Sequence, residues 1–149
     1  MEGVNGLFRH ILVPTDGSRP SNSAGKLAVQ LALTHHATLT FIYVIDDSVV
    51  DKLTVSLGEK KEKIIRDLKH SGQKYLDYLV HLTRNTNLKS TQIICQGVSW
   101  NEISRLARKE NVDLIVMGQV GRSGSRRLLI GSVAERVIEL SPCPVLVVK

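Results

Sequence analysis

Hydrophobic residues recur along the chain in two patterns that alternate with one another. Short apolar runs bounded by proline, glycine or polar clusters are typical of buried strands, and apolar residues spaced three or four apart are typical of amphipathic helices. The apolar runs predict five strands, at residues 10–14, 37–45, 91–95, 111–117 and 144–148. The helical spacing predicts four helices, at residues 18–36, 59–84, 99–109 and 132–140.

The order of these elements predicts an α/β fold. Strands that alternate with helices form a parallel sheet through right-handed crossovers, with helices on both faces. All 149 residues fit a single domain, in which residues 1–7 form a polar lead-in that we expect to be flexible. Residues 46–58 show no clear periodicity and are predicted to form a loop over the strand ends.

Two of the predicted helices begin with a capping-box pattern, in which a serine is followed three residues later by a glutamate. Ser99 precedes Glu102, and Ser132 precedes Glu135. We therefore expect each serine side chain to cap its helix.

Residues 118–132 contain a glycine-rich stretch between a predicted strand and a predicted helix, and three of its glycines are Gly118, Gly121 and Gly131. Glycine permits positive φ and lets backbone N–H groups approach an anion, and a helix start offers unpaired N–H donors with a positive dipole end. The stretch therefore predicts a phosphate site, in which the Ser132 hydroxyl either donates to phosphate or caps the helix. A flexible surface connection is the alternative.

Three arginines, Arg122, Arg126 and Arg127, lie in the same stretch. Their guanidinium groups could pair with phosphate, although exposed arginines also serve simply as a solvated surface.

Asp16 follows the first predicted strand within Thr15-Asp-Gly-Ser18. Its carboxylate either forms an Asx turn and helps to cap the next helix, or accepts hydrogen bonds from the ribose or base of a ligand, and both roles can coexist. Parallel sheets bind ligands outside the carboxyl ends of the strands, where the strand order reverses. The loop with Asp16 and the glycine-rich stretch are therefore expected to face one ligand.

A net charge of +6 and a pI near 9.6 raise the possibility of nucleic-acid binding. The basic residues are scattered, however, and only two Phe and one Trp are available for stacking on bases. The one tight basic cluster lies in the glycine-rich stretch, which favours a small phosphorylated ligand. The chain has no P-loop, no Gly-x-Gly-x-x-Gly after the first strand and no Gly-x-Ser-x-Gly elbow.

Three acidic residues, Asp46, Asp47 and Asp51, follow the second predicted strand, but nothing in their spacing fixes a metal geometry. The sequence has no apolar run long enough for a membrane helix and no secretory h-region at its start. Its two cysteines form no CxxC pair. We therefore expect a cytoplasmic protein with reduced thiols.

Three segments together resemble the universal stress protein family, in the branch that binds ATP, and the likeness covers essentially the whole chain. They are Ile11-Leu-Val-Pro-Thr-Asp-Gly-Ser18, the spacing Gly118-x2-Gly121-x9-Gly131-Ser132, and Ser132-Val-Ala-Glu-Arg-Val137 followed by Pro142-Cys-Pro-Val-Leu-Val147. The resemblance implies a three-layer α/β/α domain of the adenine nucleotide alpha hydrolase-like, Rossmann-like class. Its five-stranded parallel sheet would have the order 3-2-1-4-5.

The resemblance also implies roles for individual residues. The family often has His-Val at the end of the second strand, and Tyr43 takes the place of that His, which leaves an implied backbone contact from Val44 to adenine intact. The adenosine would be approached by Pro14, Thr15 and Asp16, the ribose by Met117 and Gly118, and the phosphates by Gly121, Gly131, Ser132 and Val133. Family members commonly form homodimers through their last strands, which here would be residues 144–148.

Two functions from different classes follow. The first is a regulatory module that binds ATP, or ADP or AMP, and acts through a downstream partner. The second is a slow ATP hydrolase that uses Mg²⁺ or Mn²⁺. The sequence favours the binding module, because it positions no general base and contains no Walker lysine. A nucleotide-free chaperone-like or DNA-associated protein is suggested only by the breadth of the family and the net charge.

Overall fold

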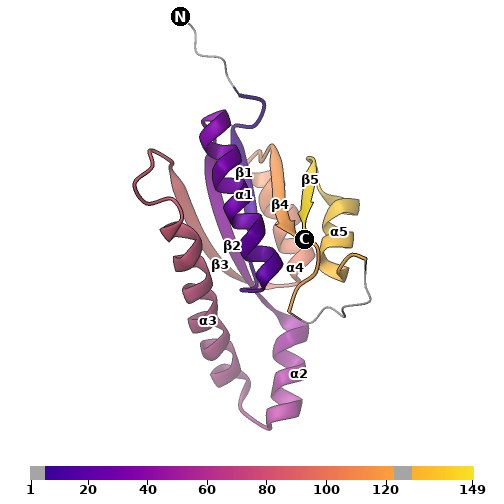
Figure 1. Cartoon of the computed structure of the whole chain (residues 1–149). Coiled ribbons are helices and arrows are strands. Elements are labelled where there is room, and N and C mark those ends of the chain that lie inside the picture. The colour runs from indigo at the N-terminus through magenta and orange to yellow at the C-terminus, as the bar shows by residue number, and fades with distance from the viewer. Residues whose placement is uncertain (1–5, 123–128) are drawn as a thin grey trace, which may run out of the picture.

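The computed structural model describes residues 6–122 and 129–149, which form one parallel sheet covered by helices on both faces (Figure 1). The sheet has five strands in the order β3-β2-β1-β4-β5, so the predicted fold class is confirmed. The elements are β1 (His10–Pro14), α1 (Arg19–His35), β2 (Thr38–Asp46), α2 (Asp47–Leu57), α3 (Lys61–His81), β3 (Ser90–Gly97), α4 (Ser99–Lys109), β4 (Leu114–Gly118), α5 (Ser132–Leu140) and β5 (Val145–Val148).

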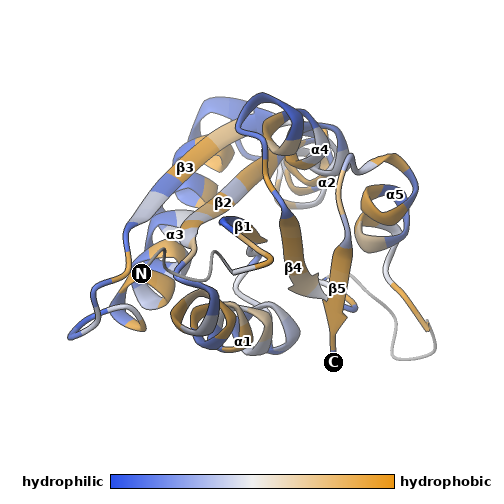
Figure 2. Ribbon diagram, turned by 90° about the horizontal axis from the view of Figure 1, so that it is seen from above, coloured by the Kyte–Doolittle hydropathy of each residue, from blue (hydrophilic) through white to orange (hydrophobic). Residues whose placement is uncertain are grey.

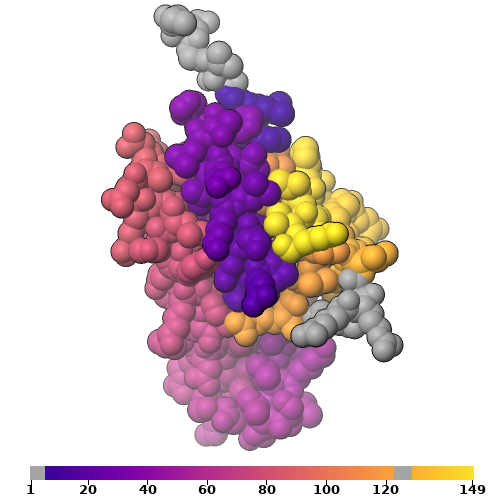
Figure 3. All heavy atoms as spheres, in the orientation of Figure 1, coloured from indigo at the N-terminus to yellow at the C-terminus, as the bar shows by residue number. Residues whose placement is uncertain are grey.

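The central strands are apolar on both faces because each face packs on helices. Side chains alternate across a strand, so Ile11 and Val13 of β1 belong to the core shared with α1 and α3. Leu12, between them, belongs to the core shared with α4 and α5. Figure 2 shows the hydrophobic strands β4 and β5 between helix α1 on one face of the sheet and helix α5 on the other. Figure 3 shows α1 on the surface of one face, with α3 and β5 on either side of it.

The prediction of a loop at residues 46–58 is wrong, because α2 occupies most of this segment. Asp46 caps the helix, since its Oδ1 accepts a hydrogen bond from the N–H of Ser48 at 2.9 Å. Gly58 ends the helix in the left-handed conformation, with φ of 62°. The apolar spacing was weak because Val50 is the one buried residue of α2, whereas Val55 is 84% exposed.

Both capping-box predictions are also wrong. The N-cap position of α4 is occupied by Val98, and that of α5 by Gly131. Among the described residues, neither N-cap residue accepts a hydrogen bond with its own side chain, and Ser99 and Ser132 are the first residues of their helices. Their hydroxyls are thereby available for other contacts.

The described part of the chain contains no helix long and apolar enough to cross a membrane. Of the lead-in predicted to be flexible, residues 1–5 lie outside the described residues. The backbone N–H of Leu7 donates to Nδ1 of His35 at 3.1 Å.

The sheet order places the switch point between β1 and β4. The chain builds β2 and β3 on one side of β1 and then crosses back to place β4 on the other side. Because all five strands are parallel, the segments that follow β1 and β4 emerge side by side at the same edge of the sheet. These segments contain Asp16 and the glycine-rich stretch.

Candidate functional site

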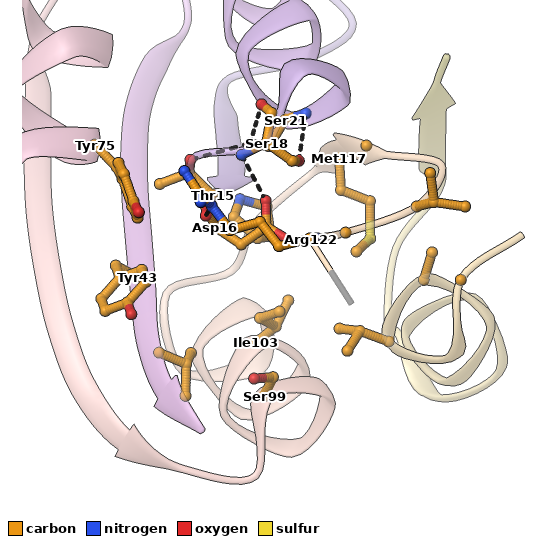
Figure 4. Close-up of a pocket in the computed structure, with 18 of the residues that line it drawn as sticks. Thr15, Asp16, Ser18, Ser21, Tyr43, Tyr75, Ser99, Ile103, Met117 and Arg122 are labelled. Carbon is orange, nitrogen blue, oxygen red and sulfur yellow. Dashed lines mark hydrogen bonds between the residues drawn. The ribbon is translucent and has the colours of Figure 1, made fainter. Parts of the chain in front are cut away.

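A cavity of about 530 Å³ lies outside the carboxyl ends of the strands (Figure 4). Its volume is within the range of about 300–1,000 Å³ that is typical of small-molecule sites. All of the described residues predicted to contact a ligand line it, namely Pro14, Thr15, Asp16, Val44, Met117, Gly118, Gly121, Arg122, Gly131, Ser132 and Val133. The fold thus gathers them at one place, while their contact with a ligand stays a prediction.

The loop after β1 is held in place by its own side chains. The N–H of Thr15 donates to the carbonyl of Ile42 at 2.9 Å, which ties the loop to β2. Oδ1 of Asp16 accepts from the N–H of Ser18 at 3.0 Å, so the predicted Asx turn is confirmed. Ser18 in turn caps α1 by accepting from the N–H of Ser21 at 3.3 Å.

Arg122 joins the segment after β4 to the loop after β1. Its backbone N–H donates to Oδ2 of Asp16 at 2.8 Å, and its Nε donates to the carbonyl of Asp16 at 2.8 Å. Its Nη2 donates to the carbonyl of Gly17 at 3.4 Å, and its guanidinium lies over the Tyr75 ring, 4.9 Å from the ring centre. The guanidinium predicted to pair with phosphate therefore has protein partners. Arg126 and Arg127, the other two candidates, lie outside the described residues.

The described glycines of the stretch act through their small size. Positive φ was expected to be part of their role, but none of Gly118, Gly121 and Gly131 has it. A Cβ at Gly118 would lie 2.9 Å from the backbone of Pro20, and one at Gly131 would lie 3.2 Å from Cα of Val120. Gly118 therefore lets the end of β4 approach the start of α1 closely, and Gly131 lets the segment after β4 fold back on itself.

The N-terminus of α5 opens into the cavity without a side-chain cap. Ser132, Val133 and Ala134 line the cavity and form the first turn of the helix, whose N–H groups have no intrahelical partner. None of these three N–H groups donates a hydrogen bond to another described residue. They form a group of donors at the positive end of a helix dipole, which suits an anion.

The opposite side of the cavity was not predicted from the sequence. Tyr43 of β2 and Tyr75 of α3 lie there, away from Met117 (Figure 4). Val49 and Leu53 of α2 and Leu68 of α3 also line the cavity, and Leu53 and Leu68 pack against the same core as the two tyrosines. Interpreting residues 46–58 as a loop hid the contribution of α2. For the tyrosines, the departure from His at position 43 was the available signal.

Asp46 joins α2 to α4 through Ser99, which lines the cavity. Its Oδ2 accepts from the N–H of Ser99 at 2.9 Å and from the Ser99 hydroxyl at 2.5 Å, and its Oδ1 accepts from the Ser48 hydroxyl at 2.6 Å. Burial raises the pKa of the Asp46 carboxyl, but the hydrogen bonds from Ser48 and Ser99 outweigh it and hold that pKa below its usual value. Within the described ranges, no three His, Cys, Asp or Glu residues are grouped so that they could hold a metal ion.

The sequence matches known proteins along nearly its whole length. The model of the universal stress protein family matches residues 7–149. Universal stress protein MJ0531 of Methanocaldococcus jannaschii is 41% identical over 144 residues, which cover 96% of this chain and 83% of that protein.

Solved structures share the fold. The structure of protein MJ0577 of the same organism matches with a TM-score of 0.84 and 28% identity, covering 96% of both chains. The universal stress protein from Archaeoglobus fulgidus in complex with dAMP matches with a TM-score of 0.66 and covers 96% of this chain and 99% of that one. At 17% identity, this second likeness is one of fold.

Proposed function

This chain belongs to the universal stress protein family, and we propose that its cavity binds an adenine nucleotide, with ATP as the expected ligand. In this proposal the protein is a regulatory binding module of a stress response, and the binding of nucleotide is the signal to which it responds.

The N-terminus of α5, which has no side-chain cap, is the observation that carries the proposal. Three adjacent N–H groups, those of Ser132, Val133 and Ala134, face the cavity without a described acceptor. Phosphate oxygens would accept from them and from the Ser132 hydroxyl, and the helix dipole would favour the negative charge. Gly121 and Gly131 also line the cavity, and Gly131 directly precedes this turn.

The nucleoside would lie along the cavity from the phosphates toward β2. Met117 and Gly118 end β4 and would lie beside the ribose. Asp16 would accept from the ribose or the base, because each of its carboxylate oxygens has a described donor at present and can accept a second. The backbone of Val44, in β2, would meet the adenine edge.

A divalent cation would arrive with the nucleotide. Mg²⁺ commonly keeps several waters and binds through substrate phosphates with one or two carboxylates. The carboxylate oxygens of Asp46, which is bonded to the cavity-lining Ser99, already accept from Ser48 and Ser99. The phosphates of ATP would therefore be the main ligands of Mg²⁺ or Mn²⁺.

The chemistry of a structural neighbour supports the choice of ligand class. The Archaeoglobus fulgidus protein is described in complex with dAMP, which is an adenine nucleotide. Carrying that class of ligand to this chain is part of the proposal, since the two sequences are 17% identical.

The proposal is tested by asking what the purified protein holds and binds. Mass spectrometry of the small molecules released on denaturation should detect an adenine nucleotide, and calorimetry with ATP and Mg²⁺ should show a heat of binding. If neither is found, the proposal fails. Phosphate release from ATP well above that of the Ser132→Ala variant would show a slow hydrolase instead of a binding module.

We also propose that two copies of the chain pair through β5. This strand is at the edge of the sheet, and its unpaired backbone groups can extend the sheet into a partner. Apolar side chains accompany that edge, with Leu146 37% exposed and Ile138 of α5 47% exposed. Light scattering coupled to size-exclusion chromatography should give twice the chain mass of 16.5 kDa. A mass of one chain at micromolar concentration would contradict the proposal.

A further inference from the structure

Two tyrosines form the side of the cavity that lies away from α5. Tyr43 of β2 and Tyr75 of α3 both line the cavity, and their rings meet edge to face with centres 5.9 Å apart and an angle of 70° between the planes (Figure 4). The guanidinium of Arg122 lies over the Tyr75 ring. This side of the cavity is therefore aromatic, whereas the α5 side presents N–H donors.

Each ring is fitted against a glycine. A Cβ at Gly72, in the middle of α3, would lie 2.1 Å from Cδ1 of Tyr43. A Cβ at Gly17 would lie 2.4 Å from Cε1 of Tyr75. Glycine within a helix costs about 1 kcal/mol relative to alanine, so Gly72 destabilises α3 and in return makes room for the Tyr43 ring. Each ring is thus packed closely against backbone on one side.

The hydroxyl of Tyr43 is available to a ligand even though the residue is only 7% exposed. No described residue forms a hydrogen bond with it. Tyr43 lines the cavity, and its Oη is not among the fully enclosed side-chain atoms without a partner in the described ranges. Burial, helped by the nearby Tyr75 and Asp16, raises the pKa of Tyr43 to about 12. The phenol is therefore neutral at physiological pH and can both donate and accept.

From these contacts we propose that Tyr43 and Tyr75 form the base-binding end of the cavity, and that the Tyr43 hydroxyl forms a hydrogen bond with the polar edge of the base. This inference rests on the proposed function, because that function places the phosphates at α5 and the base at β2. A flat aromatic base can pack against the rings of Tyr43 and Tyr75, since offset and edge-to-face contacts between rings are favourable. A buried phenol without a protein partner gains a partner when the base binds.

The test compares Tyr43→Phe with the wild type by calorimetry, using ATP and the base-free anion tripolyphosphate. The substitution removes only a hydroxyl that has no described protein partner, so the variant should fold. We expect the Kd for ATP to rise about 3- to 10-fold, as for the loss of one hydrogen bond. The Kd for tripolyphosphate should stay unchanged, because that ligand has no base. Tyr78→Phe is the matched control, since Tyr78 is in the same helix as Tyr75 but is 37% exposed and outside the cavity lining.

The outcomes separate this inference from the function on which it rests. If the wild type binds ATP and Tyr43→Phe binds it equally well, the inference is wrong and the proposed function stands. An equal loss of affinity for ATP and for tripolyphosphate would also overturn the inference, because the effect would not depend on the base. If the wild type does not bind ATP, the proposed function fails and the inference fails with it.

Discussion

The close packing of Gly72 against Tyr43 leads to a prediction with a definite sign. In Gly72→Ala, the new Cβ would lie 2.1 Å from Cδ1 and 2.4 Å from Cε1 of the Tyr43 ring. The ring cannot easily move aside, because it is 7% exposed and is in contact with the ring of Tyr75. Either the ring or helix α3 must shift.

Two effects of opposite sign decide the change in stability. Replacing a glycine within a helix by alanine stabilises the helix by about 1 kcal/mol. Forcing a methyl group into a filled core costs about 1–3 kcal/mol, and the 2.1 Å approach places this case near the upper end. We therefore expect the free energy of unfolding to fall by about 1–2 kcal/mol, which lowers the Tm by about 3–6 °C in a chain of this length.

Thermal and urea unfolding followed by circular dichroism would measure this change. In a Tyr43→Ala background the ring is gone, so Gly72→Ala should instead stabilise the protein by about 1 kcal/mol. His70→Ala is the matched control, since His70 is exposed in the same helix and its replacement should be neutral or stabilising. Gly72→Ala that is as stable as the wild type, or that has the same sign in both backgrounds, would refute the reasoning.

Two further substitutions test how the cavity is built. Asp46→Asn weakens the hydrogen bonds to Ser48 and Ser99, so we expect the free energy of unfolding in urea to fall by about 1–2 kcal/mol at pH 7. Because the pKa of Asp46 is lowered in the folded protein, its stabilisation is complete above the unfolded pKa and is lost as the pH falls through the folded pKa. The difference between wild type and variant should therefore shrink on acidification, and a difference that is constant down to pH 3 would contradict this. Arg122→Lys loses the planar contact with Tyr75 and the forked hydrogen bonding, so the free energy of unfolding should fall by about 0.5–1.5 kcal/mol. An unchanged Tm would count against this role of Arg122.

The sequence predicted the sheet well because its strands are buried on both faces. Runs such as Ile11 to Val13 and Leu114 to Met117 are continuously apolar, and helices with an apolar face separate them along the chain. Helix α2 escaped prediction because its one buried residue, Val50, produces no periodicity. It is capped by Asp46, whose carboxylate also accepts a hydrogen bond from Ser99 in a distant part of the chain. That contact does not follow from local sequence.

The candidate site could be predicted only in part, because local sequence gives its loops but not the contacts between them. Loops that carry glycine, serine and aspartate signals, such as those with Asp16 and Gly131, can be assigned to the strand ends from the sequence. The contacts among them cannot, because Arg122 meets Asp16 across more than 100 residues. The capping-box pattern at Ser132 was misleading, since Gly131 takes the capping position and the first turn of α5 opens into the cavity.

A single pair of variants at Ser132 tests nucleotide binding at α5 most directly. Ser132→Asp adds a negative charge where the phosphates are proposed to bind, and an acidic residue in the first turn should stabilise the helix by about 0.3–1 kcal/mol. Ser132→Asn is the matched control, because the Asn side chain is nearly the same size as that of Asp but is uncharged. By calorimetry with ATP and Mg²⁺, we predict that the Asp variant is folded but has a Kd at least about tenfold higher than the wild type, while the Asn variant stays within about threefold. Equal binding of ATP by the wild type and the Asp variant would contradict the placement of phosphates at α5.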